Sequence, residues 1–283
     1  MKESDLHIRN MSRKELDRVI DWAAAEGWNP GRKDPECFFT ADPEGFLIGE
    51  LNGEPVASIS VVRYGEDFAF LGLYIVRPEF RGQGFGLRIW QEGMKRLAGF
   101  NIGLDGVVAQ QPNYRKSGFS PTYRNIRQEG VTDGARVEDP RLVDLTDLPF
   151  AEVEAYDRRY VPAPRSGFLK HWLHASGHQA LGLMEEGNLQ GIGVIRPCRS
   201  GYKIGPLFAE SPDRAETLLT ALLSRVTPGQ PFYLDTPEPN ADALALANRH
   251  NMSPVFETTR MYTGSFPDIP LEGLYGVTSF ELG

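Results

Sequence analysis

The stretch Leu71 to Gly99, LGLYIVRPEFRGQGFGLRIWQEGMKRLAG, decides the fold of this chain. Its apolar start belongs to the run 70–76, which is rich in β-branched and aromatic residues and ends before Arg77-Pro78. This run predicts a buried strand. Its second part carries apolar residues three or four positions apart, on one helical stripe: Leu87, Trp90, Met94 and Leu97. The stretch therefore predicts a strand, a tight turn and an amphipathic helix in direct succession.

The turn between this strand and helix has glycine at every second position, Arg81-Gly82-Gln83-Gly84-Phe85-Gly86. Glycine tolerates positive φ, and successive N–H groups in such a turn can point together at an anion. The start of the helix adds unpaired N–H groups and the positive end of the dipole, and Arg81 adds a charged donor. We interpret the turn as a pyrophosphate site, with plain turn punctuation as the alternative. No Gly-Lys-Ser/Thr and no closing acidic residue of a βαβ unit accompany it, which argues against Walker and dinucleotide loops.

The spelling from Val76 to Gly86, V-x-P-x-x-R-G-Q-G-x-G, closely resembles the acyl-CoA-binding segment of the GNAT family of N-acetyltransferases. The resemblance implies acetyl-CoA as cosubstrate and a strand end, Tyr74 to Val76, that pairs with the pantetheine amides and polarises the thioester carbonyl. It implies the following cofactor-binding residues: Tyr74, Ile75, Val76, Arg81, Gly82, Gln83, Gly84, Phe85, Gly86 and Tyr114.

Tyr114 lies in Asn113-Tyr114-Arg115-Lys116-Ser117-Gly118-Phe119, which resembles the Y-x-x-x-G-F segment of the same family. The resemblance implies that Tyr114 is the general acid beside the CoA sulfur, since a phenol can protonate a developing thiolate. A packed surface tyrosine is the alternative. Gln110-Gln111 departs from the asparagine that many relatives carry there, which leaves the cofactor contacts of this helix open.

Length and composition bound the class of protein. A chain of 283 residues with 41% hydrophobic residues can build two globular cores. A net charge of −8 gives no basic footprint for nucleic acid or an anionic membrane. Cys37 and Cys198 are too few for a disulfide framework and have no metal-ligand spacing around them. No apolar signal region or membrane-length segment is present, so we expect a cytoplasmic protein.

The order of predicted elements is that of one mixed acyltransferase domain. Ser12 and Glu15 form an S-x-x-E capping box for a first helix, and Asn52-Gly53 marks a hairpin within an antiparallel meander that ends at Val76. The helix from Leu87, a strand at 102–108, a short helix around Tyr114 and a strand at 122–128 follow. We predict an α/β (α+β) fold with a mixed, largely antiparallel sheet flanked by helices.

The second half looks like a copy of the first. Ser120-Pro121, Tyr123 and Arg127 recur 133 positions later as Ser253-Pro254, Phe256 and Arg260. At this offset the residues 81–86 fall on 214–219, where every glycine is gone and Ser211-Pro212 opens an ordinary helix.

We therefore predict a catalytic domain at 1–130, a linker at 131–139 and a second domain at 140–283 that keeps the fold but lacks the phosphate turn. The pattern resembles tandem acetyltransferases of the YitH type, which have a degenerate C-terminal domain.

The sequence marks no general base. Several acidic residues are candidates, a water chain is an alternative, and we select Asp34 because it lies in the region that lines the acceptor mouth in relatives; the full set is Glu26, Asp34, Glu50, Glu66 and Asp67. For acceptor binding we select Trp28, Asn29 and Phe38 together with Arg165, with ordinary surface charge as the alternative for Arg165. We expect the segments 28–39 and 158–172 to face one another.

His171, His174 and His178 are spaced i, i+3 and i+7, but Gly177 interrupts the helix and no carboxylate or thiol completes a ligand set, so we predict no metal site. We predict an acetyl-CoA-dependent N-acetyltransferase that acts on a primary amine of a small molecule by direct attack in a ternary complex. A non-catalytic acyl-CoA sensor and a protein N-terminal or lysine acetyltransferase remain alternatives. We expect no nucleic-acid or membrane partner, and a homodimer stays open.

Overall fold

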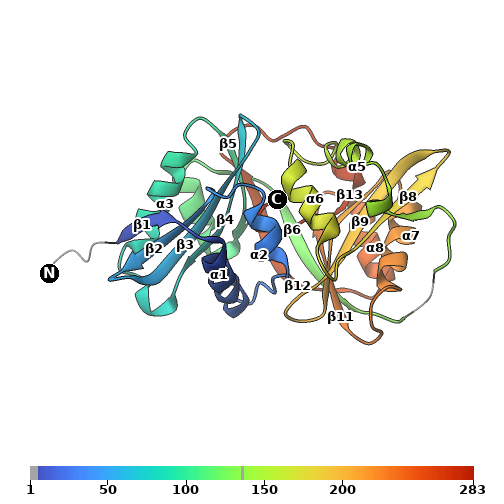
Figure 1. Cartoon of the computed structure of the whole chain (residues 1–283), viewed down its shortest axis with the longest axis horizontal. Coiled ribbons are helices and arrows are strands. Elements are labelled where there is room, and N and C mark those ends of the chain that lie inside the picture. The colour runs from blue at the N-terminus through green and yellow to red at the C-terminus, as the bar shows by residue number, and fades with distance from the viewer. Residues whose placement is uncertain (1–5, 135–136) are drawn as a thin grey trace.

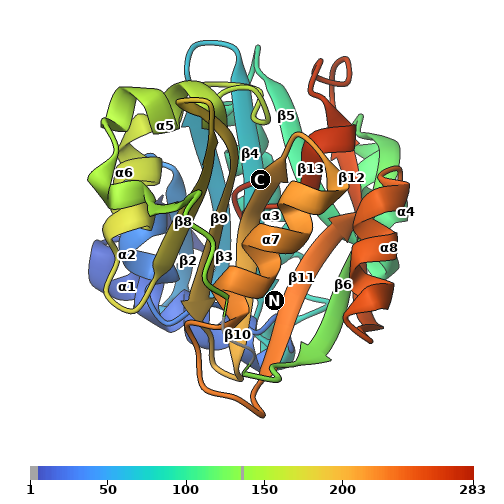
Figure 2. The ribbon, with the colours of Figure 1, turned by 90° about the vertical axis from the view of Figure 1, so that its right-hand side faces the viewer.

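The computed structural model describes residues 6–134 and 137–283. Residues 1–5, where the sequence shows no apolar signal region, and residues 135–136 of the predicted linker lie outside the described residues. Figure 1 shows two halves side by side, with β6 and β12 between them, and Figure 2 shows the second half from its outer side.

The first half follows the order predicted from the sequence. Its elements are β1 (His7–Asn10), α1 (Arg13–Ala25), α2 (Asp34–Phe39), β2 (Phe46–Leu51), β3 (Glu54–Tyr64), β4 (Phe68–Val76), α3 (Phe85–Arg96), β5 (Asn101–Val107), α4 (Gln111–Lys116) and β6 (Ser120–Val131). The capping box is formed, since the Ser12 N–H donates to the Glu15 carboxylate at 2.7 Å. Asn52 and Gly53 both have positive φ, as the hairpin signal predicts.

The second half repeats this order. Its elements are β7 (Leu142–Asp144), α5 (Phe150–Asp157), α6 (Ser166–His174), β8 (Gln179–Glu185), β9 (Asn188–Pro197), β10 (Tyr202–Ala209), α7 (Pro212–Leu223), β11 (Pro231–Pro237), α8 (Ala241–Arg249), β12 (Ser253–Tyr262) and β13 (Leu274–Gly276). Short 3-10 helices lie at Pro78–Phe80, Val108–Gln110, Leu145–Asp147 and Leu271–Gly273.

The halves exchange their last long strands within one continuous sheet. The strand order is β1-β2-β3-β4-β5-β12-β6-β11-β10-β9-β8-β7, and β13 pairs with β10. β12, from the second half, therefore pairs with β5, whereas β6 pairs with β11 of the second half. The predicted cut at residue 130 does not separate two sheets, because β6 and β12 each continue the sheet of the other half.

The two exchanged strands are paired through a local pseudo-twofold arrangement. In their antiparallel ladder Arg127 lies opposite Phe256, and Tyr123 lies opposite Arg260. The offset of 133 matches Tyr123 to Phe256 and Arg127 to Arg260, so the two ladder pairs are equivalent to each other. The repeat seen in the sequence thus becomes a structural symmetry at the junction.

Three apolar clusters cover the sheet. One cluster joins side chains of α1, α2, α5 and α6 and spans both halves, including Leu16, Phe38, Val153 and Trp172. The two other clusters are local to one half: α3 and α4 pack on the first half, and α7 and α8 pack on the second. Because one core is shared, the two halves are packed against each other and not joined by the linker alone.

Candidate active site

The main cavity lies where β4 and β5 part. The two strands pair in parallel only from Phe68 with Asn101 to Leu71 with Leu104. Beyond this point a bulge interrupts the β3–β4 ladder, and Leu73 takes a positive φ of 44° while its carbonyl accepts a hydrogen bond from the Ser58 hydroxyl at 2.8 Å. The opening has a volume of about 540 Å³, and residues 71–76 form one wall.

The glycine turn forms the phosphate end of this cavity. Gly82 and Gly84 have φ of 75° and 85°, a conformation that disfavours other residues, and a side chain added at either would meet nothing within 4 Å. The N–H groups of residues 82–84 have no hydrogen-bond acceptor among the described residues. A helix start with free N–H groups in front of an open cavity is suited to a pyrophosphate.

Two other residues of the turn differ from the sequence-based expectation. Arg81 donates to the Val76 carbonyl at 2.8 Å and forms an ion pair with Glu26, so its guanidinium is occupied within the protein. Gln83 donates to the Glu79 carbonyl at 3.2 Å. Gly86 lies directly against Tyr74, since an added Cβ would be 2.7 Å from the Tyr74 hydroxyl, which holds the start of α3 close to the strand.

Tyr114 lines the same cavity from the opposite side. Its ring stacks on Trp90 at 5.4 Å, and Trp90 in turn contacts Tyr74 at 5.2 Å. Burial raises the pKa of Tyr114 above its ordinary value, and the nearby Tyr74 acts in the same direction. The phenol therefore stays protonated at neutral pH, which is the state needed to donate a proton to a thiolate.

The second half completes the cavity with residues that the sequence did not indicate. Phe256 and Thr258 come from β12, and Phe280 and Glu281 come from the segment after β13. The backbone of Glu281 lies against Gly72, where an added Cβ would be 2.1 Å from the Glu281 carbonyl oxygen. Only glycine fits at position 72. A glycine within a predicted strand can indicate a close contact, but it does not indicate which residue makes that contact.

Asp34, selected as the base, is placed elsewhere. Its side chain is fully buried, accepts from Arg196 Nε at 2.9 Å and from the Gly31 N–H at 2.7 Å, and does not line the cavity. Burial by itself would raise the pKa of Asp34, but the charges of Arg196 and Lys203 hold it below its ordinary value. A carboxylate bound in this way is a structural anion that lies outside the cavity.

The predicted acceptor residues are divided between the cavity and the junction. Trp28 lines the cavity. Asn29 instead exchanges hydrogen bonds with the backbone of Ser200 at 3.0 and 2.9 Å. Phe38 is fully buried and stacks on Trp172 at 6.3 Å, so the segments 28–39 and 158–172 do face one another, but as packed core.

Arg165 is also buried away from the main cavity. It donates two hydrogen bonds to Asp157, at 2.9 and 2.7 Å, and further ones to Thr278 and Gly283. It lines a separate small cavity of about 30 Å³. Arg165 thus holds the chain segment that carries Glu281 and does not line the main cavity.

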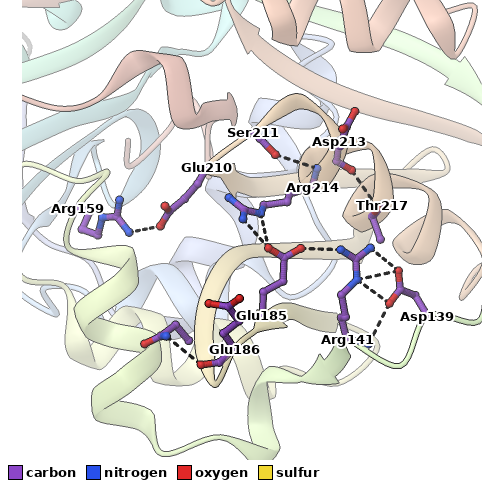
Figure 3. A network of polar contacts seen from close by, with 11 residues as sticks. Asp139, Arg141, Arg159, Glu185, Glu186, Glu210, Ser211, Asp213, Arg214 and Thr217 are labelled. Atoms are coloured by element: carbon purple, nitrogen blue, oxygen red, sulfur yellow. Dashed lines mark hydrogen bonds and ion pairs between the residues drawn. The ribbon is translucent and has the colours of Figure 1, made fainter.

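The equivalent opening in the second half is filled. β10 and β11 pair only over Tyr202–Ile204 with Phe232–Leu234, and β13 then pairs with β10 where the strands part. At the start of α7, Ser211 caps the helix and Arg214 binds Glu185, as Figure 3 shows. Glu185 also accepts from Arg141, so no cation of this network faces an open phosphate site (Figure 3).

The fold and the cavity define an acyltransferase of the GNAT class. The model of the acetyltransferase (GNAT) family matches residues 13–119, and that of a second acetyltransferase (GNAT) domain matches residues 153–276. The chain belongs to the GNAT family and carries two of its domains.

Two named relatives are similar to this chain over most of its length. Holothin acyltransferase of a Pseudoalteromonas species is 33% identical over 96% of this chain and 92% of that relative. The N-acetyltransferase YitH of Bacillus subtilis is 24% identical over 62% of this chain and 64% of its own length.

Solved structures support the fold. A structure from Pyrococcus horikoshii, assigned as an acetyltransferase, has a TM-score of 0.84 at 23% identity and covers 100% of this chain and 98% of its own. A tandem GNAT protein from the clavulanic acid biosynthesis pathway has a TM-score of 0.65 at 14% identity, with 93% and 100% covered. Among the residues described in the structure, no helix is long and apolar enough to cross a membrane.

Proposed function

We propose that this protein transfers an acetyl group from acetyl-CoA to a primary amine of a small molecule, by direct attack in a ternary complex. The observation that carries the proposal is the main cavity of about 540 Å³, which joins the glycine turn, Tyr114 and side chains of the second half. A cavity of this size suits a small ligand, and its walls are preformed.

The residues of the first half would divide the work as follows. The N–H groups of the turn at Gly82 and Gly84 would hold the pyrophosphate, and the exposed edge of β4 at 74–76 would pair with the pantetheine arm. Tyr114 would protonate the departing thiolate. Each role uses groups that face the cavity, and none requires Asp34 or Arg165.

The two cysteines favour direct attack over an acyl-enzyme intermediate. Cys37 and Cys198 are buried, and neither lines the cavity. Burial raises the pKa of Cys37 to about 12 and also raises the pKa of Cys198, so neither supplies a thiolate at neutral pH. Intersecting lines in initial-velocity plots are expected, whereas parallel lines would indicate a ping-pong mechanism.

The test is release of CoA thiol from acetyl-CoA with a panel of amines, with acetylated products identified by mass spectrometry. Holothin belongs in the panel because a relative is named for it. A lysine peptide and a peptide with a free N-terminus cover protein acetylation. If acetyl-CoA binds but no amine is acetylated, the protein is an acyl-CoA sensor instead. A cytoplasmic location and a homodimer remain predictions from the sequence.

A further inference from the structure

Three carboxylates line the main cavity, and they differ in what they bind. Glu26 forms an ion pair with Arg81. Asp105 accepts two hydrogen bonds from Arg260, at 2.9 and 2.7 Å, and one from Asn125 at 2.8 Å. Glu281 is only 4% exposed, and no hydrogen bond or ion pair to its side chain exists within residues 6–134 and 137–283. Glu281 is thus the cavity carboxylate with unused acceptor capacity.

The position of Glu281 is fixed from several sides. Its backbone lies against Gly72 of β4, and the Tyr64 hydroxyl donates to the neighbouring Leu282 carbonyl at 3.1 Å. Arg165 donates to Thr278 and Gly283, on either side of it. A carboxylate that is held rigidly yet left without a partner is prepared for a ligand.

Aromatic side chains of the second half lie beside it. Phe256 and Phe280 have ring centroids 6.3 Å apart, and the Arg127 guanidinium lies over both rings, at 5.6 and 4.8 Å. Arg127 also donates to the Trp28 carbonyl at 2.7 Å, so Trp28, another aromatic residue of the cavity, is bound to the same guanidinium. These rings offer flat apolar walls next to a carboxylate.

The charges around Glu281 disfavour a cationic ligand. The groups that act on its charge are Lys203, Asp34, Arg127 and Arg196. Each arginine is paired with an aspartate, whereas within the described part of the chain the Lys203 ammonium donates a hydrogen bond only to the Trp28 carbonyl, at 3.4 Å. In their ionised forms Glu281 and Lys203 balance each other, and an ammonium ion added to this pair would leave a net buried charge, which is costly.

We propose that Glu281 takes the proton from the attacking amine, and that Phe256 and Phe280 hold a flat acceptor whose amine is neutral at physiological pH. This inference rests on the proposed function. It assigns the acceptor site to the second half of the chain and the acceptor to the class of conjugated, weakly basic aromatic amines. Burial raises the pKa of Glu281, with Lys203 acting against it, which brings the group closer to neutral pH than an ordinary carboxyl.

The step balances without any further reactant. The amine nitrogen forms a bond to the thioester carbonyl carbon, and one N–H proton passes to the Glu281 carboxylate. The C–S bond then breaks, and Tyr114 gives its proton to the thiolate sulfur. Transfer of the proton from Glu281 to the Tyr114 phenolate restores both groups, and the products are the amide and CoA thiol.

The first test uses Glu281→Gln, which keeps the shape of the side chain but cannot accept the proton. With aniline as acceptor we expect kcat to fall by about 10²–10⁴-fold while the acetyl-CoA dissociation constant from calorimetry stays unchanged. Glu281→Asp should restore part of the rate. The control is Glu272→Gln, in the same C-terminal segment but exposed and outside the cavity, which should retain full activity.

The second test compares acceptors on the unaltered protein. Aniline and benzylamine both carry a flat phenyl ring, but only benzylamine is largely a cation at neutral pH, so aniline should have the higher kcat/KM. Phe280→Leu should raise the KM for aniline and leave acetyl-CoA binding alone.

Four outcomes separate the hypotheses. If the wild-type protein acetylates no amine, the proposed function fails. If it does, but Glu281→Gln turns over at the wild-type rate, the role of Glu281 is wrong. If the Gln variant does not fold, a Glu281→Ala variant that keeps the wild-type kcat overturns it equally. Preference for benzylamine over aniline overturns the acceptor class.

Discussion

Arg127 on β6 and Asp235 on β11 form a two-bond ion pair across the exchanged strands, at 2.7 and 2.8 Å, with side chains 3% and 1% exposed. Arg260 and Asp105 form the equivalent pair between β12 and β5. Each arginine also lies over aromatic rings, Arg127 over Phe280 and Arg260 over Phe70. The two arginines that are equivalent in the sequence repeat therefore each form a buried ion pair, called a clamp below, and these two clamps hold the two halves in one sheet.

Removal of one partner of the first clamp should destabilise the protein. Arg127→Met leaves the Asp235 carboxylate buried without its cation, which typically costs about 3–5 kcal/mol. The double variant Arg127→Met/Asp235→Leu should lose much less, because no uncompensated charge remains. Urea unfolding followed by tryptophan fluorescence measures both. Equal losses in the single and double variants would show that the ion pair itself is not the cause.

The phosphate turn can be tested against a glycine of the same conformation. Gly84 in the turn and Gly187 in the β8–β9 hairpin have φ of 85° and 78°, and an added side chain would meet nothing at either. Gly84→Asp should abolish acetyl-CoA binding, since its carboxylate would repel the pyrophosphate. Gly187→Asp carries similar backbone strain and should bind normally. Calorimetry decides, and normal binding by Gly84→Asp would contradict the assigned site.

One acetyl-CoA should bind per chain. The opening between β10 and β11 is filled by β13. The α7 helix begins with Ser211 as its N-cap and has no glycine turn before it. The stoichiometry from the same titration measures this directly. A value of two would mean that the second half opens to admit cofactor.

The parts of the fold that local rules govern could be predicted from the sequence. The strand, turn and helix at 71–99, the Ser12–Glu15 box and the Asn52-Gly53 hairpin all depend on residues close in the chain. The strand exchange could not be predicted, because either half could satisfy its own edge with its own last strand. The sequence repeat contains no information on which copy of the strand pairs with which.

The site residues show the same division. Tyr114 and the glycine turn are marked by spacing, and the structure brings both to one cavity. Asp34 could not be told apart from a functional carboxylate, because its partner Arg196 lies 162 positions away. Glu281 and Phe256 carry no signal of their own, since they reach the cavity only through the exchanged strand and the segment after β13.

Tyr114→Phe should separate binding from chemistry. Loss of the phenolic proton donor should reduce kcat by about 10²–10⁴-fold and leave acetyl-CoA affinity unchanged. Tyr123→Phe is a matched control, since Tyr123 is buried to a similar degree but lies outside the cavity. Steady-state kinetics with a responsive amine supply the measurement. An unchanged rate in Tyr114→Phe would remove this residue from the mechanism.

His178 makes the stability depend on pH. It is buried at the end of the α6 region, its Nδ1 is 2.8 Å from the Trp172 carbonyl, and its ring meets Trp172 edge to face at 5.1 Å. Burial, reinforced by the charge of Arg196, lowers the pKa of His178 from 6.5 to about 4. Between these pH values the unfolded chain binds a proton that the folded protein does not, so stability falls as the pH is lowered.

His178→Phe should remove this dependence. The wild-type protein should lose on the order of 2–3 kcal/mol between pH 6.5 and pH 4 from this group alone, as each pKa unit corresponds to about 1.4 kcal/mol. The variant keeps an aromatic ring against Trp172. Its midpoint of urea unfolding should fall less than that of the wild-type protein as the pH is lowered across that range. His171→Gln is the control, because His171 is exposed on α6, the helix that precedes His178, and should leave the pH dependence of stability unchanged. If His178→Phe and the wild-type protein lose stability in parallel, other groups cause the loss of stability at low pH. Protonation of His178 then does not destabilise the folded protein.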